Sequence, residues 1–97
     1  MSAVDEIERH HHDHQHHPFK VDVLYNGVAK HFEVRPQELV KALLEQAIKK
    51  FGPIPNAHTL SLYNAGGQEL DDNQTIAAAG VKAGDQLLLR PSQVKGG

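Results

Sequence analysis

Apolar and polar residues alternate between residues 19 and 34, and the alternation is interrupted once, by Asn26-Gly27. A period of two residues is typical of a β-strand with one buried face, and Asn-Gly favours the two positive φ angles of a type I′ hairpin turn. A two-residue turn fixes these pairs on the apolar face: Tyr25 with Val28, Val23 with Lys30, Val21 with Phe32, Phe19 with Val34. On the opposite face it pairs Lys20 with Glu33 and Asp22 with His31. Both faces agree on one register, so we predict an antiparallel hairpin.

The next segment has the spacing of an amphipathic helix. Its apolar stripe consists of Leu39, Val40, Leu43, Leu44, Ala47, Ile48 and Phe51. Pro36 suits the first helical position, and Gly52 can adopt the left-handed conformation that ends a helix. Glu38 near the start and Lys49 and Lys50 near the end complement the helix dipole. We expect this helix to cover the apolar face of the hairpin.

The rest of the chain reads as two further strands separated by turns. Residues 59–63 alternate, 64–67 form a turn, and Leu70 marks a very short strand or bulge. Residues 75–80 resemble one helical turn that ends at Gly80, and 86–89 form the last strand. We therefore predict a folded unit at 18–90, between a disordered His-rich tail at 1–17 and a flexible tail at 91–97.

The size and composition of the chain exclude several classes of function. A chain of 97 residues with 39% hydrophobic residues builds one core and leaves little room for a deep substrate cavity. The net charge of -2 and only five Phe and Tyr residues argue against nucleic-acid binding. No cysteine is present, which excludes disulfides and thiol nucleophiles. We expect a cytoplasmic monomer with no membrane segment and no secretion signal.

Histidine is the other chemically active residue type here. The N-terminal tract contains His10, His11, His12, His14, His16 and His17. These imidazoles suit Zn, Ni or Cu, but a flexible tail fixes no coordination geometry, so any metal binding is expected to be adventitious. A solvated native tail or a purification tag is the favoured interpretation, and the interruptions at Asp13 and Gln15 argue against an engineered tag. His31 and His58 have no serine or acid at the spacing of a catalytic triad. We predict no enzymatic activity and no bound cofactor.

The order of these features, from residue 19 to the end, resembles ubiquitin and its relatives. The resemblance rests on the hairpin with Gly27, the helix, Leu60 and Leu62, Glu69-Leu70-Asp71-Asp72, Thr75-Ile76, Gly80-Val81, Leu87-Leu88-Leu89-Arg90 and Gly96-Gly97. It implies an α+β fold, the ubiquitin-like β-grasp, in which a mixed sheet of four to five strands packs on one helix. The most similar group is the bacterial ubiquitin-like modifiers encoded beside E1-like, E2-like and JAB-type peptidase genes, some of them linked to phage defence.

The resemblance implies that the Gly97 carboxylate is the reactive group. An E1-like enzyme would adenylate it with ATP, carry it as a thioester, and pass it through an E2-like enzyme to an amine of a target protein, forming an isopeptide bond. Gly96 and Gly97 have no Cβ, so they suit a narrow enzyme tunnel. In isolation, two terminal glycines would favour a frayed end or a cloning remnant, and the β-grasp pattern just upstream reverses that preference.

Two further sets of residues follow from the resemblance. Arg90, Val94 and Lys95 match the residues through which activating enzymes recognise ubiquitin, although another alignment makes Arg90 an ordinary surface residue. Leu24, Ser61, Tyr63 and Leu88 match the exposed apolar patch of ubiquitin, although scattered exposed apolar residues are normal on any protein.

Two alternative functions share the fold. A sulfur carrier would use the same terminal carboxylate as a thiocarboxylate, after adenylation by a partner enzyme. A non-covalent β-grasp interaction module would need no chemistry at Gly97 at all.

Overall fold

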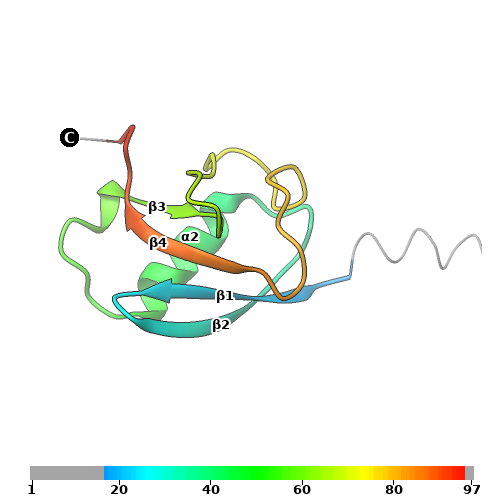
Figure 1. The fold of residues 1–97 in the computed structure, drawn as a ribbon, viewed down its shortest axis with the longest axis horizontal. Helices are drawn as coiled ribbons and strands as arrows, with labels where there is room; N and C mark the ends of the chain where they lie inside the picture. The colour runs from blue at the N-terminus through cyan, green and yellow to red at the C-terminus, as the bar shows by residue number, and fades with distance from the viewer. Residues whose placement is uncertain (1–16, 96–97) are drawn as a thin grey trace, which may run out of the picture.

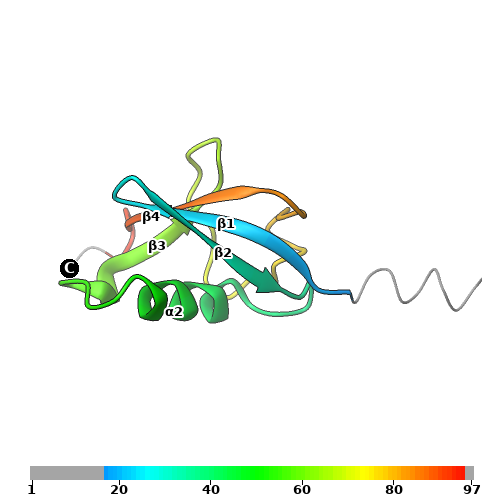
Figure 2. The same cartoon turned by 90° about the horizontal axis from the view of Figure 1, so that it is seen from below.

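The computed structural model describes residues 17–95. Its elements follow in the order β1 (Phe19–Tyr25), β2 (Val28–Val34), α2 (Val40–Lys50), the short 3-10 helix η1 (Ala57–Thr59), β3 (Leu60–Tyr63) and β4 (Gln86–Pro91). The strands form a four-stranded sheet in the order β2-β1-β4-β3, and α2 lies across one face of it (Figures 1 and 2). The predicted mixed sheet on one helix, the ubiquitin-like β-grasp, is confirmed.

The hairpin of β1 and β2 has the predicted register, from Phe19 opposite Val34 to Tyr25 opposite Val28. Asn26 and Gly27 adopt φ angles of 55° and 82°, as the type I′ turn requires. Two polar side chains on the outer face also meet as expected, because His31 Nδ1 lies in hydrogen-bond contact with Asp22 Oδ1. Local sequence alone therefore specifies this part of the fold.

Helix α2 begins at Val40, four residues after Pro36, so the predicted start is wrong. The cause is the segment at 71–76, which pairs with the residues before the helix through the bridge between Leu39 and Thr75. The helical N–H groups of Val40 and Lys41 then donate to the carbonyls of Gln74 and Asp72. Leu39, expected in the buried stripe, is 42% exposed. The end is as predicted, with Gly52 at a φ of 89°.

The core lies between the sheet and α2. It consists of Val21, Val23, Phe32, Val34, Val40, Leu43, Leu44, Ala47, Leu60, Leu62, Leu70, Ile76, Val81, Leu87 and Leu89. Every strand contributes alternate residues, and α2 contributes its apolar stripe. Removal of this apolar surface from water is the main stabilising term of so small a domain.

The very short strand or bulge expected at Leu70 takes the form of an isolated bridge at the neighbouring Glu69. Leu70 N donates to the carbonyl of Leu62 at 2.8 Å, and a single bridge joins Tyr63 to Glu69. The buried Leu70 side chain anchors this connection to the core. Strand β4 runs to Pro91, two residues past the predicted end, and pairs in parallel with β1 and antiparallel with β3.

Candidate functional site

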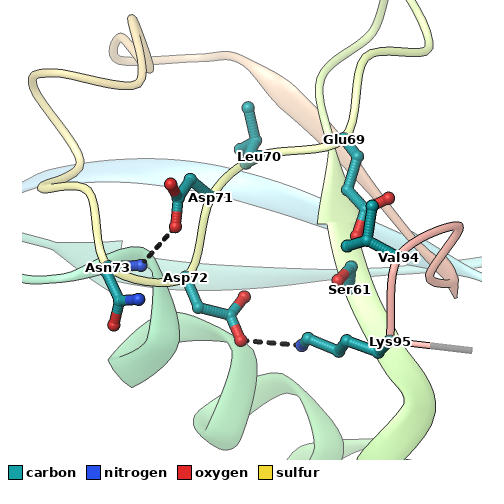
Figure 3. Close-up of a pocket in the computed structure, with 8 residues that line it drawn as sticks. All are labelled: Ser61, Glu69, Leu70, Asp71, Asp72, Asn73, Val94 and Lys95. Carbon is teal, nitrogen blue, oxygen red and sulfur yellow. Dashed lines mark hydrogen bonds and ion pairs between the residues drawn. The ribbon is translucent and has the colours of Figure 1, made fainter.

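The residues after β4 turn back and bind the body of the domain beside β3. We call this arrangement the C-terminal clasp, and it consists of Glu69, Asp72, Ser92, Gln93 and Lys95. Figure 3 shows the part of the chain that carries Val94 and Lys95 facing the 69–73 segment. The clasp joins the predicted tail to the body of the domain through polar side chains.

Ser92 is the centre of the clasp. Its backbone N–H donates to the carbonyl of Thr59 at 2.8 Å. Its hydroxyl donates to Glu69 Oε2 and accepts hydrogen bonds from the N–H groups of Val94 and Lys95, at 3.0 and 2.9 Å. One short side chain therefore fixes the turn of the chain after β4 and attaches that turn to Glu69.

Glu69 receives the tail with both carboxylate oxygens. In addition to Ser92, the N–H of Gln93 donates to Glu69 Oε1 at 3.0 Å. These bonds favour the charged form, and the Ser92 hydroxyl is the main reason that the pKa of Glu69 is lowered from 4.5, against the opposing effect of burial. The buried Ser61 hydroxyl faces the same carboxylate and adds to this effect on the pKa, but it makes no hydrogen bond of standard geometry within the described residues.

The Tyr63 hydroxyl lies between Glu69 and the end of β4. It donates to the carbonyl of Pro91 at 2.7 Å and lies 3.4 Å from Glu69 Oε1. Burial first, and the Glu69 charge second, raise the pKa of Tyr63 above 10.0. The phenol therefore stays protonated and keeps its hydrogen bond to the chain that leaves β4.

Lys95 closes the clasp at its far end. Its Nζ lies 2.7 Å from Asp72 Oδ2 and donates to the carbonyl of Leu60, also at 2.7 Å. The two charged side chains are 27% and 23% exposed, so the pair is only partly screened by water. An ion pair of this kind contributes on the order of 1 kcal/mol, which is enough to bias the tail without locking it.

The 69–73 segment is held in place by its backbone. The carbonyl of Asp72 accepts from the N–H of Lys41 at the start of α2, and the Asp71 carboxylate accepts from the N–H of Asn73 at 2.9 Å. Asp72 therefore lies where the helix dipole favours a negative charge. The same short segment supports the helix and binds the tail.

A cavity of about 410 Å³ lies beside the clasp. The 69–73 segment lines it on one side and Val94 and Lys95 on the other, with Ser61 between them (Figure 3). The cavity stays open while Lys95 is bound to Asp72, because Lys95 forms part of its wall.

The apolar patch predicted from Leu24, Ser61, Tyr63 and Leu88 is not formed as a whole. Leu24 and Leu88 are neighbours on adjacent strands and are half-buried. Ser61 is 0% exposed and Tyr63 is 5% exposed, so the expectation that they lie on the surface is wrong. The end of β4 lies against Tyr63, whose hydroxyl donates to the carbonyl of Pro91 and whose ring centre is 5.9 Å from the Arg90 guanidinium.

The three residues matched to enzyme recognition lie in different surroundings. Arg90 is exposed at the end of β4, and Val94 is 83% exposed. Lys95 is held by Asp72 and Leu60. The flexible tail predicted at 91–97 is thus hydrogen-bonded to the body from Ser92 to Lys95, whereas Gly96 and Gly97 lie outside the described residues.

Of the histidine tract, His10, His11, His12, His14 and His16 also lie outside the described residues, and His17 is exposed. Between residues 17 and 95, no three His, Asp or Glu side chains come together as a metal site. The helices in this same range are too short or too polar to span a bilayer.

Sequence reasoning missed the roles of Glu69 and Asp72. Both belong to the Glu69-Leu70-Asp71-Asp72 run that carries the resemblance, but nothing in the run itself shows that it binds the tail. A usable signal was the combination of this acidic run with a single cation, Lys95, beyond the last strand.

Comparison with solved structures shows the fold. The ubiquitin of Caldiarchaeum subterraneum is 24% identical, with a TM-score of 0.67, and the match covers 82% of this chain and 100% of that one. A de novo designed protein based on ubiquitin is 20% identical, with a TM-score of 0.70 and coverage of 82% and 95%. ATBAG1, in a structure of its complex with HSP70, is 18% identical with a TM-score of 0.66, and the match covers 79% of this chain but only 42% of ATBAG1.

A search of curated proteins finds no match. Residues 21–89 match the family described as protein YukD of the WXG100 protein secretion system (Wss). This range covers more than half of the chain and contains every strand residue of the core. The protein, a ubiquitin-like domain by fold, therefore belongs to the YukD family of the WXG100 protein secretion system.

Proposed function

We propose that this protein is a non-covalent interaction module that binds a protein component of a WXG100 secretion system. The family match supports the link to that system. The ubiquitin-like fold supports a binding role, since ATBAG1, which is similar to this chain over part of its length, forms a complex with HSP70. In this role the domain presents a surface and catalyses no reaction.

The observation that carries the proposal is the C-terminal clasp. A modifier must extend the residues before its reactive carboxylate into the active site of an activating enzyme. Here Ser92, Gln93 and Lys95 are bound to Glu69, Asp72 and the carbonyl of Leu60 instead. The hydrogen bonds to Glu69 involve a charged acceptor and contribute about 1.5 to 3 kcal/mol each, so extension of this segment has an energetic cost. That cost opposes conjugation and does not oppose binding through the body of the domain.

The conjugated modifier is the second candidate, because the sequence Val94-Lys95-Gly96-Gly97 keeps the apolar-basic-Gly-Gly order of ubiquitin. An E1-like enzyme, an E2-like enzyme and a deconjugating peptidase would then be its partners, and ATP their cosubstrate. The sulfur carrier needs the same adenylation. Both functions require that the clasp opens first.

The test compares the full chain with a variant that lacks Gly96 and Gly97. Each protein carries the same affinity handle and is used to capture separately purified components of the WXG100 system of the same cell. We expect both forms to bind the same component with equal affinity. We expect no covalent adduct and no thiocarboxylate after incubation with ATP and an E1-like enzyme.

Three results would contradict a non-covalent binding role. A thioester that disappears when Gly97 is removed, together with Gly-Gly remnants on lysines of other proteins, would establish the modifier and overturn the proposal. A terminal sulfur in place of oxygen, detected by intact mass, would establish the sulfur carrier. Failure of every component to bind would also overturn it.

A further inference from the structure

The two borders of the sheet differ in what covers them. At one border, β3 is covered by the segment that follows it, since the N–H of Leu70 donates to the carbonyl of Leu62 and a bridge joins Tyr63 to Glu69. At the other border, β2 has β1 as its only strand neighbour within the described part of the chain (Figure 1). An edge strand of this kind is a template on which a further strand can form.

The hairpin register shows which backbone groups of β2 point to this open edge. Tyr25 and Val28 flank the two-residue turn, so this pair exchanges both backbone hydrogen bonds, and such pairs then alternate along the hairpin. The groups that point away from β1 are the N–H and C=O of Ala29, His31 and Glu33. In agreement, Lys50 at the end of α2 reaches the edge from outside, and its Nζ donates to the His31 carbonyl at 3.2 Å. A lysine side chain thus stands where the next strand would bind.

The helix-facing side of this edge carries two lysines that have no acidic partner. Lys50 Nζ lies 5.1 Å from the centre of the Phe32 ring, and Lys30 Nζ lies 5.6 Å from the centre of the Phe51 ring. Neither lysine forms an ion pair within residues 17–95. Lys30 and Phe32 are two positions apart on one face of β2, which corresponds to about 7 Å. The edge therefore presents two positive charges at the spacing of alternate residues in a strand.

The outer side of the same edge is hollowed. A cavity of about 280 Å³ follows β2 there, and its lining residues are Lys20, His31, Phe32 and Glu33. A residue placed opposite His31 in an added strand would point to the same face as His31 and reach this cavity. A β-branched side chain suits this position, because it favours the extended backbone.

We propose that the open edge of β2 binds an extended, acidic segment of the protein partner as an additional antiparallel strand. The residue opposite His31 donates its N–H to the carbonyl that Lys50 now holds. The residues before and after it lie on the helix-facing side, opposite Phe32 and Lys30, and they are the acidic ones. The inference rests on the proposed binding role and names the segment that the partner supplies.

The position of Lys50 makes this edge selective for acids. Lysines on edge strands normally oppose pairing with other chains, and Lys50 does so here by holding the His31 carbonyl. A neutral strand would displace the ammonium without giving it a new partner. A strand with an acid opposite Phe32 gives it a carboxylate instead, so the pairing of backbone and charge is gained together.

The experiment titrates the full chain with the capped peptide acetyl-Thr-Glu-Val-Glu-Thr-amide and follows backbone amide shifts by NMR. We expect saturable shifts at Ala29, His31 and Glu33 at millimolar peptide, and slower hydrogen exchange of the His31 N–H. A matched peptide with glutamine in place of both glutamates should bind about three- to tenfold more weakly, because two exposed ion pairs are lost. A third peptide, N-methylated at the central valine, lacks the N–H for the His31 carbonyl and should bind at least about tenfold more weakly.

Variants separate this site from general electrostatics. Lys30→Ala and Lys50→Ala should each lower the preference for the glutamate peptide over the glutamine peptide by at least about twofold. Lys82→Ala is the matched control, because it removes an exposed positive charge from the turn before β4, beyond β1 from β2. It should leave this preference unchanged.

Four results would overturn the inference: equal binding of the glutamate and glutamine peptides, undiminished binding of the N-methylated peptide, shifts centred away from β2, or no shifts up to roughly 10 mM peptide. An equal effect of Lys82→Ala and Lys30→Ala would do the same. Failure of the proposed function looks different. Capture of a secretion component by a protein that ignores the acidic peptide would leave the function standing and remove only this site, and peptide binding without capture of any component would do the reverse.

Discussion

The carboxylate of Glu69 accepts a hydrogen bond from the hydroxyl of Ser92, 23 positions further along the chain. The same carboxylate accepts the N–H of Gln93. The segment after β3 and the segment after β4 therefore form one hydrogen-bonded unit. A substitution in either segment should destabilise the other one as well.

Replacement of Glu69 by glutamine should loosen this unit while preserving its shape. We expect Glu69→Gln to destabilise the domain by about 1 to 3 kcal/mol, because the charged acceptor is lost and its partners become poorly paired. Urea denaturation measures this loss, and amide hydrogen exchange should become faster at Gln93 and Lys95. The exposed Glu45→Gln should change stability by less than about 0.5 kcal/mol, and equal effects of the two variants would contradict the role of Glu69.

Acid should weaken the clasp in a specific pH range. The folded pKa of Glu69 is lowered from 4.5, so its ionised form is favoured in the folded protein. This contribution is complete above pH 4.5 and is lost as the pH falls through the lowered folded pKa. Urea titrations should therefore show the stability difference between wild type and Glu69→Gln shrinking as the pH falls below 4.5. A difference that stays constant would mean that the carboxylate does not titrate with the clasp.

The ion pair of Lys95 and Asp72 should have a measurable coupling energy. A double-mutant cycle with Lys95→Ala and Asp72→Ala isolates the pair from the other effects of each substitution. We expect a coupling of about 1 kcal/mol, at the upper end for surface pairs, because both side chains are roughly three-quarters buried. High salt should reduce it. Strict additivity of the two substitutions would show that the pair does not hold the tail.

Adjacent leucines of β4 should differ strongly in their effect on stability. Leu87 is 1% exposed in the core, whereas Leu88 is half-buried on the outer face of the sheet. We expect Leu87→Ala to cost about 2 to 5 kcal/mol and Leu88→Ala less than about 1.5 kcal/mol. Thermal or urea unfolding of the two variants checks the assignment of faces. The reverse order would require a different strand register.

The hairpin turn should tolerate added volume but not added conformational restriction. A Cβ at Gly27 would meet no atom within 4 Å, but the residue has a φ of +82°. We expect Gly27→Ala to cost about 1 to 2 kcal/mol through backbone strain alone. Gly66→Ala is the matched control, since its Cβ would make only a 3.4 Å contact with Asn64 and its φ lies outside the positive range. Stability measured for both variants distinguishes strain from packing.

The parts of the fold that could be predicted from sequence are those set by neighbouring residues. The hairpin register follows from a two-residue turn and an alternating pattern, and the end of α2 follows from Gly52. The start of α2 could not be predicted from Pro36, because the carbonyls of Gln74 and Asp72 cap the helix from a distant part of the chain. Tertiary contacts of this kind override the helix-start preference of a single residue such as Pro36.

The candidate site was predicted less well for the same reason. Alternation placed Tyr63 and Ser61 on the outer face of the sheet, and that face is exposed only where nothing folds over it. Here Tyr63 is bonded to Pro91 at the end of β4 and lies beside Glu69, to which Ser92 is attached. The side chains that bind the tail are those of Glu69 and Asp72, and acids on a surface loop carry no local sign of a distant partner.

The two strands paired at the centre of the sheet, β1 and β4, are the first and the last strands of this domain to leave the ribosome. During synthesis β1 has β2 on one side and an open edge on the other until Gln86–Pro91 emerge. Nascent chains that stop before this point cannot complete the sheet and expose an aggregation-prone strand edge. Products truncated before β4 should therefore be less stable and more prone to aggregate than the complete domain.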